Sequence, residues 1–237
     1  MNFFLILVLF CLGGCATKYV IPGNRFLTPE TQGQAFRGQV ELLQTNANQL
    51  TIDVTKDTVD EGVIYNDLSR MGFLLSHSFF EQFDVIWSHT GSANSMLGGK
   101  FQFYGASRTA NGLEHKLAIA AMVGANEHET PDEAVEFKLG GQEFLIIYGY
   151  RFSEIVLAYG SFSHATYDFE GTISAPGTGI DGAKPKLKTK VNSLSAGVEL
   201  TLNAFFGKLE GTYQQLQTSD TKEKLRLAVG YSIGLNW

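Results

Sequence analysis

Residues Lys224 to Trp237, KLRLAVGYSIGLNW, decide the fold. From Leu225 onward every second residue is large and apolar, and the residues between them are small or polar. A period of two indicates a β-strand with one apolar face and one face of polar or small residues. The stretch is longer than the about 9 to 11 residues that a strand needs to cross a bilayer. It therefore predicts a transmembrane β-strand.

The same alternation recurs along the chain and predicts further strands. Between Val135 and Tyr150 the apolar parity slips by one at Gly140-Gly141-Gln142, which predicts one long strand with a β-bulge, or else a hairpin at the two glycines. We expect an all-β fold: an antiparallel up-and-down transmembrane β-barrel of about 10 strands, with 8 or 12 as alternatives. The other apolar series are Phe36 to Leu42, Leu50 to Val54, Met71 to Leu75, Phe83 to Trp87, Leu97 to Phe103, Leu117 to Val123, Ile155 to Tyr159, Leu194 to Leu200 and Phe205 to Tyr213.

The links between these strands differ in length. Short turns are predicted at residues 80–82, 152–154 and 203–204, and longer links at 57–69, 125–134 and 170–186. Outer-membrane barrels place short turns in the periplasm and longer loops outside. If both termini are periplasmic, these short turns fall on the periplasmic side and the longer links face outward.

The N-terminal residues have a different pattern. Phe3 to Leu12 are almost all apolar but too few to span a bilayer as a helix, which predicts a signal peptide over residues 1–14. Leu12-Gly13-Gly14-Cys15 resembles the bacterial lipobox, although no Lys or Arg precedes the apolar run; an ordinary signal ending near Ala16 is the alternative. The resemblance implies acylation of Cys15 in the periplasmic leaflet. We expect a lipidated flexible tether over residues 15–33 and the barrel over residues 34–237.

Two segments resemble the strand-turn-strand units of small bacterial outer-membrane β-barrel proteins. They are Met71-Gly72-Phe73-Leu74 through Phe83-Asp84-Val85, and Tyr148 to Ser153. The family resemblance implies a Gram-negative outer-membrane protein, porin-like in fold, that is both integral and lipid-anchored. Its implied partners are outer-membrane lipid, the barrel-assembly machinery and the lipoprotein-sorting machinery, with a homo-oligomer as a further expectation. The C-terminal residues resemble the assembly signal of such barrels: Tyr231, Ile233, Leu235 and Trp237.

The parity opposite to the apolar one predicts which charges face the lumen. Both signs occur in similar numbers, and an unpaired buried charge costs several kcal/mol, so we expect a salt-bridged interior. An open polar channel is the alternative. The predicted lumen charges are Arg37, Glu41, Arg70, Asp84, Lys100, Lys116, Glu136, Lys138, Glu143, Glu199, Lys208, Glu210 and Arg226.

Catalysis has little support in the sequence. Ser163 and His164 with Asp168 form the most suggestive group, but Ser163 and His164 have opposite parity and face opposite ways. No histidine spacing predicts a metal site, no motif predicts a cofactor, and a net charge of −6 without basic clusters gives no sign of nucleic-acid binding. We expect a non-enzymatic envelope protein with a structural or narrow-channel role. The alternative is a barrel-embedded hydrolase of the protease or lipid A-modifying type.

Overall fold

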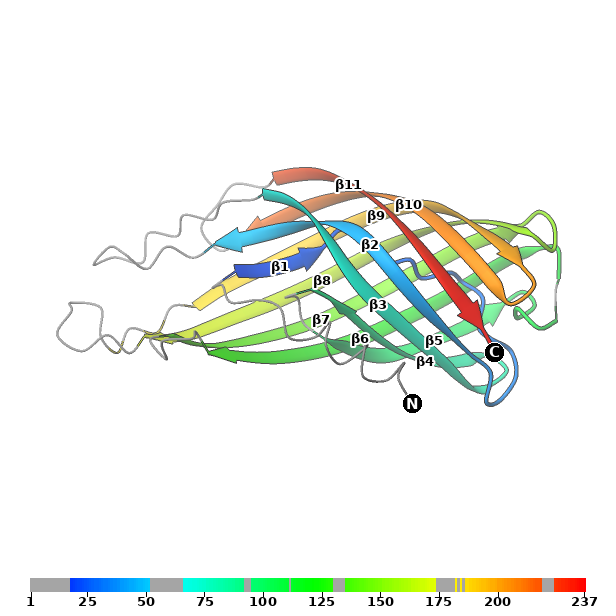
Figure 1. The fold of residues 1–237 in the computed structure, drawn as a ribbon, viewed down its shortest axis with the longest axis horizontal. Coiled ribbons are helices and arrows are strands. Elements are labelled where there is room, and N and C mark those ends of the chain that lie inside the picture. The colour runs from blue at the N-terminus through cyan, green and yellow to red at the C-terminus, as the bar shows by residue number, and fades with distance from the viewer. Residues whose placement is uncertain are drawn as a thin grey trace, which may run out of the picture.

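The computed structural model describes residues 18–51, 66–91, 95–110, 112–129, 135–173, 182, 184, 186–218 and 224–237. The expected signal peptide and Cys15 lie outside these residues. The described elements are strands (Figure 1). Their bounds are β1 Lys18–Pro22, β2 Gly38–Thr51, β3 Asn66–Phe80, β4 Phe83–Thr90, β5 Met96–Tyr104, β6 His115–Glu129, β7 Val135–Arg151, β8 Val156–Ile173, β9 Lys186–Leu202, β10 Phe205–Thr218 and β11 Lys224–Asn236.

Strands β2 to β11 form a closed antiparallel barrel. Each pairs with its neighbours in chain order, and β2 closes the ring by pairing with both β3 and β11. Closure removes the free edges of the sheet. A β-sheet in a bilayer needs this because unpaired backbone groups at an edge would find no hydrogen-bond partners in lipid. The predicted fold and the count of ten strands are confirmed. Over the described residues, no helix combines the length and the apolar character needed to cross a membrane.

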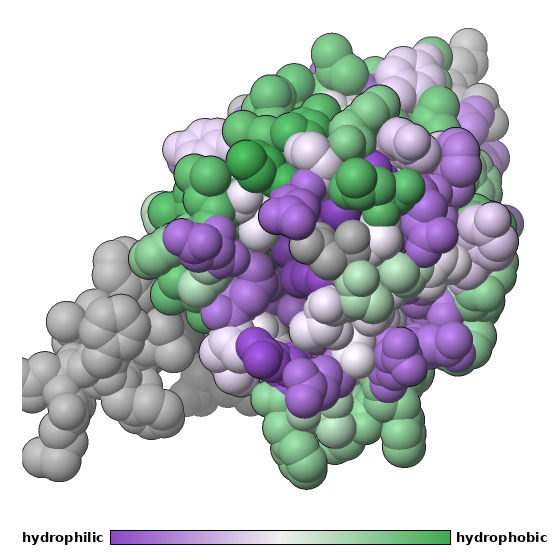
Figure 2. Space-filling view, turned by 90° about the vertical axis from the view of Figure 1, so that its right-hand side faces the viewer, coloured by the Kyte–Doolittle hydropathy of each residue, from purple (hydrophilic) through white to green (hydrophobic). Residues whose placement is uncertain are grey.

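The apolar parity faces outward, as predicted. On β11 all seven large residues of this parity are exposed, whereas Ala228 and Ser232 between them are buried. Figure 2 looks at the end that carries the C-terminus, and polar side chains gather around its centre while apolar ones occupy much of its margin. The barrel is therefore apolar on its outside, whereas its inside holds buried polar and charged residues together with a buried apolar cluster that includes Leu74, Ile86 and Leu145. The exposed β11 residues are Leu225, Leu227, Val229, Tyr231, Ile233, Leu235 and Trp237.

The apolar belt ends at a similar level on β9 and β10. On β9 the outward residues change from Leu194 to Asn192 and Lys190, and on β10 they change from Tyr213 to Gln215. These positions are neighbours in the sheet, since Tyr213 pairs with Leu194. An outer-membrane belt is about 25 Å tall, which matches an apolar run from Phe205 to Tyr213 on a tilted strand.

Strand β7 is one long strand, but the predicted bulge in it is wrong, and so is the alternative hairpin. Its pairing with β6 and β8 runs through Gly140 and Gly141 without a register shift. Leu139 is buried instead, and Glu136 and Lys138 are exposed. The parity of the apolar residues inverts here because this part of β7 lies above the belt, where the outside is water and the inside is not.

The barrel wall continues beyond the belt with this inverted polarity. On the outside Lys186 pairs with Glu170 at 2.7 Å, and Lys188 pairs with Asp168 at 3.5 Å. On the inside Tyr167, Phe169, Leu187 and Val191 are buried. Charged residues outside and apolar residues inside are the pattern of a water-soluble barrel, so this part projects out of the bilayer.

The two ends of the barrel differ in most of their links, except that the ten-residue link of residues 105–114 lies at the end that otherwise carries turns of two to four residues. One end, called here the short-turn end, carries the links of residues 81–82, 105–114, 152–155 and 203–204, together with the C-terminus. The other end, called here the long-link end, carries the links of residues 52–65, 91–95, 130–134, 174–185 and 219–223. The predicted short turns fall at one end, and the predicted long links are shortened because β3, β6, β8 and β9 extend into them.

Residues 18–33, called here the plug, do not form the expected flexible tether. Strand β1 pairs with the outer part of β2, from Lys18 with Thr51 to Pro22 with Ala47, along the edge of β2 that β11 leaves free beyond Thr45. After β1 the chain runs toward the short-turn end and is buried almost throughout (Figure 1). The side chains of the plug contact residues of several different strands. The plug sequence therefore shows neither a strand period nor a helix period.

Candidate functional site: the lumen and its plug

Glu30 of the plug lies among three cations of the barrel. The Arg151 guanidinium donates to both Glu30 carboxylate oxygens, with Nε 2.6 Å from Oε1. Lys116 Nζ lies 3.3 Å from Oε1, and Arg108 Nη2 lies 3.8 Å from Oε2. Glu30 is 1% exposed. A buried carboxylate is tolerated only when it is paired in this way, so Glu30 fastens the inner half of the plug to the wall.

Glu199 of β9 links this cluster to a second one. Its carboxylate lies 2.8 Å from Arg108 Nη2, 3.4 Å from Arg151 Nη2 and 4.0 Å from Lys208 Nζ. Burial alone lowers the pKa of the Arg108 guanidinium, but the Glu199 and Glu30 carboxylates outweigh it, and the pKa lies above its ordinary value. Arg108, in the link between β5 and β6, therefore stays charged.

Lys208 of β10 holds the plug through its backbone. Its Nζ pairs with Glu41 at 2.7 Å and donates to the Phe26 carbonyl oxygen at 2.8 Å. Lys100 of β5 does the same further along, because its Nζ pairs with Asp84 at 3.3 Å and donates to the Glu30 carbonyl oxygen at 2.5 Å. Each lysine thus neutralises a wall carboxylate and satisfies a carbonyl of the plug.

Glu210 and neighbouring polar groups satisfy the plug's backbone N–H groups. The Glu210 carboxylate accepts from the N–H of Arg25 and of Phe26, both at 2.9 Å. Thr45 Oγ1 accepts from the N–H of Asn24 at 2.9 Å, and Gln102 Oε1 accepts from the N–H of Thr31 at 2.8 Å. A segment without a strand partner must find acceptors elsewhere once it is buried. The lumen supplies them from β2, β5 and β10.

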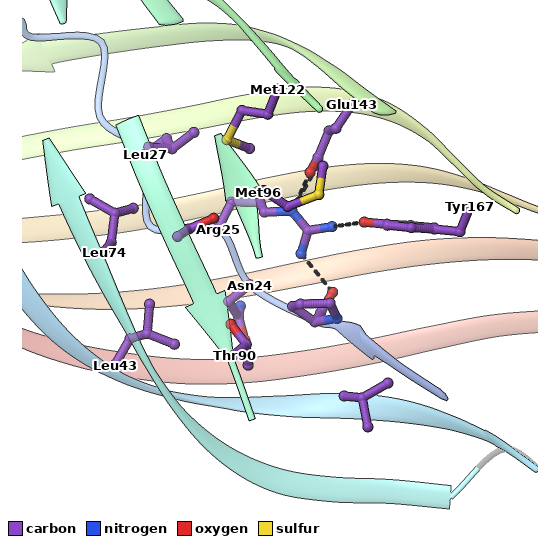
Figure 3. Close-up of a pocket in the computed structure, with 13 residues that line it drawn as sticks. Asn24, Arg25, Leu27, Leu43, Leu74, Thr90, Met96, Met122, Glu143 and Tyr167 are labelled. Carbon is purple, nitrogen blue, oxygen red and sulfur yellow. Dashed lines mark hydrogen bonds and ion pairs between the residues drawn. The ribbon is translucent and has the colours of Figure 1, made fainter. Parts of the chain in front are cut away.

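Arg25 fastens the outer half of the plug (Figure 3). Its Nε donates to the Glu143 carboxylate at 2.7 Å, its Nη2 to the Tyr167 hydroxyl at 2.8 Å and its Nη1 to the Pro22 carbonyl at 2.8 Å. Leu27 lies beside the same group. The cavity left at this level is about 20 Å³, which has room for about one water. The plug fills the lumen here.

Two wall glycines make room for the plug. A Cβ on Gly230 would lie 2.7 Å from Phe26 Cζ and 2.7 Å from Asn24 Oδ1. A Cβ on Gly149 would lie 2.8 Å from Pro29 Cγ. Real Cβ atoms do not approach so closely, so a larger residue at either inward position would require the plug or the wall to shift.

The predicted lumen charges divide into two groups. Eight are buried in the barrel: Glu41, Asp84, Lys100, Lys116, Glu143, Glu199, Lys208 and Glu210. The other five are less buried. Arg70 and Arg226 are half-buried on the inward parity of β3 and β11, each with a buried Nε. Arg37 is exposed before β2, and Glu136 and Lys138 point outward with their charges 3.9 Å apart. The last two predictions are wrong, because they assumed the bulge in β7.

Four charged residues of the site were missed by the sequence reasoning. Arg25 and Glu30 lie in the segment taken for a tether, and Arg108 lies in a link. None of the three has a strand period that could place it. Arg151 ends β7 on the same parity as the buried Glu143, so extending that parity by four more steps of two residues would have found it.

The predicted assembly residues lie on the outside of the barrel. Tyr231, Ile233, Leu235 and Trp237 are all exposed. The Trp237 N–H donates to the Gly38 carbonyl at 3.0 Å, and the Gly38 N–H donates back at 3.3 Å. The last residue of the chain is thus held at the start of the first barrel strand, where the ring closes.

The group considered for catalysis does not assemble. Ser163 is buried, whereas His164 is exposed and bonded to Asn192 at 2.8 Å. Asp168 is exposed and pairs with Lys188. Among the residues that the structure covers, no three of His, Cys, Asp and Glu come together as a metal ion would need.

Fold and lumen together define a class: a transmembrane β-barrel filled by its own N-terminal segment. No family model and no curated protein matches the chain. Among solved structures it is similar to Ail, the attachment invasion locus protein of Yersinia pestis, with 10% identity over 86% of this chain and 100% of that one and a TM-score of 0.43.

Two further solved structures have similar coverage. Neisserial surface protein A shows 9% identity over 85% of this chain and 97% of that one, with a TM-score of 0.37. The N-terminal β-barrel domain of Pseudomonas aeruginosa OprF shows 10% identity over 86% of this chain and 98% of that domain, with a TM-score of 0.34.

Proposed function

We propose that this chain is an integral protein of a bacterial outer membrane with a non-catalytic, structural role in the cell envelope. We propose further that its lumen is closed. The observation that carries the proposal is the fit of the plug. Arg25, Glu30 and the backbone between them are bonded to charged side chains that line the barrel on several strands. The cavity left beside Arg25 is only about 20 Å³, which leaves solutes no room at that level. The proposed role therefore falls to the outer surface and to the extension above the belt, which would act on partners.

Conductance of the purified protein in planar lipid bilayers tests this proposal. A closed lumen predicts a silent barrel in the wild type. Steady conductance of folded wild-type protein would contradict it, and would favour the second candidate, a narrow channel. That candidate rests on the same wall residues, because without the plug the lumen would carry a hydrated mixture of Lys100, Lys116, Lys208, Glu41 and Glu199.

Outer-membrane placement rests on the apolar belt and on the difference between the two ends. Under this proposal the short-turn end faces the periplasm and the long-link end faces outward. The assembly machinery would read the C-terminal strand, and the mature chain would begin at an acylated Cys15 after passing the lipoprotein-sorting machinery. Mass spectrometry of the N-terminal peptide tests the acylation, since an unmodified Cys15 or a cleavage near Ala16 would contradict it.

A homo-oligomer remains a separate proposal, with the outward face of β7 as its contact. Crosslinking in native membranes tests it, and monomers alone would contradict it. The hydrolase alternative lacks a triad in the described residues. His89 bonds to the Ser95 hydroxyl at 3.0 Å, His115 to the Tyr148 hydroxyl and His164 to Asn192, and no ion pair there joins any of these three histidines to a carboxylate.

A further inference from the structure

The plug has a direction. Its first residues pair with the far end of β2, where Lys18 lies opposite Thr51 at the long-link end. Its last residues lie at the short-turn end, where the Thr31 hydroxyl donates to the Glu81 carbonyl at 2.7 Å and the Gln32 N–H donates to Asp84 at 3.2 Å. The chain therefore enters the lumen at the long-link end and leaves it at the short-turn end.

The chain then turns back into the wall. At the short-turn end the Phe36 N–H donates to the Ser78 carbonyl at 3.0 Å, and the Arg37 N–H donates to the Gln34 carbonyl at 3.1 Å. Phe36 has a positive φ of 67°, as a tight reversal needs. Strand β2 begins two residues later at Gly38 and runs to the long-link end. The plug and β2 together form a long hairpin, one arm inside the barrel and one arm in its wall.

The entry point of the plug is fixed by close packing. Gly23 follows β1 and lies where β2 and β11 part: a Cβ there would be 2.1 Å from the Asn46 carbonyl oxygen and 2.4 Å from Ala228 Cβ. Asn24 comes next and donates from Nδ2 to Thr212 Oγ1 at 2.9 Å. The residues before Gly23 thus lie along β2 at the long-link end, and those after it lie in the lumen.

Chain length decides where the residues before Lys18 can reach. Cys15 lies three positions before Lys18, and an extended chain covers at most about 3.6 Å per position, or about 11 Å in all. Strand β2 between Gln39 and Thr51 covers about 40 Å at about 3.4 Å per residue. A residue at position 15 cannot return to the short-turn side while β1 is paired with β2.

We infer that the N-terminal end of the mature chain is displayed on the outer face of the membrane, although the C-terminus lies on the periplasmic side. This inference rests on the proposed outer-membrane orientation. It places any acyl group on Cys15 in the outer leaflet, against the sequence-based expectation of the periplasmic leaflet. The plug is then the segment that carries the chain from the outer face of the membrane to the periplasmic start of β2.

Labelling of single cysteines in intact cells with a membrane-impermeant maleimide tests the inference. The probe cysteine stands in a short Gly-Ser insertion between Thr17 and Lys18 of the full chain. Lys184→Cys, at an exposed residue of the long-link end, is the outer control, and Gln34→Cys, at an exposed residue of the short-turn end, is the inner control. The unmutated chain run beside them reports any free thiol at Cys15.

The expected result is labelling of the inserted cysteine and of Lys184→Cys in intact cells, and of Gln34→Cys only after permeabilisation. Labelling of the inserted cysteine only together with Gln34→Cys would overturn the inference. Reversal of both controls would instead overturn the proposed orientation. A labelled Cys15 in the unmutated chain would contradict acylation while supporting the display of the N-terminus.

A second variant keeps the inference testable if the insertion prevents folding. Ile21 and Asn48 lie opposite each other in the β1 and β2 pair and are both buried. Cysteines at directly opposed antiparallel positions fall within disulfide range. Ile21→Cys with Asn48→Cys is expected to oxidise in the folded barrel, and a folded barrel that forms no such disulfide would overturn the inference.

Discussion

Replacing Glu30 by Gln tests how firmly the plug is held. Glu30→Gln keeps the shape and the hydrogen-bond acceptor but removes the negative charge that faces Arg151, Lys116 and Arg108. Glu199 then remains as the nearest anion for Arg108 and Arg151 and is already shared with Lys208. The three cations around the plug lose a counter-charge, and repulsion among them opposes docking.

The size of the effect follows from burial. Removing one partner of a buried ion pair costs about 3 to 5 kcal/mol, and Gln belongs near the lower value because it still accepts hydrogen bonds. About 3 kcal/mol is a factor of about 100 in the docking equilibrium of the plug. The undocked state, which is too rare to detect in the wild type, becomes frequent enough to be seen as brief openings.

Single-channel recording of the variant in planar bilayers is the assay, with heat modifiability as the check on folding. Glu170→Gln is the matched control, because Glu170 also pairs with a lysine at 2.7 Å but on the exposed outside of β8. Glu30→Gln is expected to show transient conductance, and the control is expected to be as silent as the wild type. A folded Glu30→Gln barrel that stays silent would refute the view that charge holds the plug.

Three other changes test separate parts of the structure. Gly23→Ala is expected to loosen the plug and give openings like those of Glu30→Gln, because its Cβ would collide with Asn46 and Ala228, whereas Gly211→Ala, with open space around it, should stay silent. Leu209→Arg, in the middle of the belt, is expected to lower the free energy of unfolding in liposomes by about 2 to 4 kcal/mol. Gln217→Arg, on the same face above the belt, should change it little, and equal effects of the two would contradict the placement of the belt. Trp237→Ala removes the ring that packs on Gly38 and is expected to reduce the amount of heat-modifiable barrel in membranes; wild-type amounts would argue against the assembly signal.

The barrel could be predicted because each wall residue faces one of two solvents. Lipid outside and a polar lumen inside impose a period of two, and β11 shows it without a break from Leu225 to Trp237. The assumption that apolar residues face outward gave wrong predictions for Glu136 and Lys138, because it holds only within the apolar belt. Above the belt water replaces lipid, and the parity of the apolar residues inverts without any bulge.

The plug could not be predicted in this way. Arg25 and Glu30 contact strands that follow them by more than a hundred residues in the sequence, and no local pattern records such partners. The salt-bridged interior was expected between wall residues, but Glu30 and Arg25 of the plug take part in it.

Crosslinking of the plug to the wall in native membranes tests the central claim most directly. Asn24 and Thr45 are in contact, with the Thr45 hydroxyl 2.9 Å from Asn24 Oδ1. Asn24→Cys with Thr45→Cys, treated with a short thiol crosslinker, is expected to link in the folded barrel, and Asn24→Cys with the outward Leu209→Cys is expected not to. A folded barrel in which the first pair fails to link, or links no better than the second, would contradict a lumen filled by the chain's own N-terminal segment.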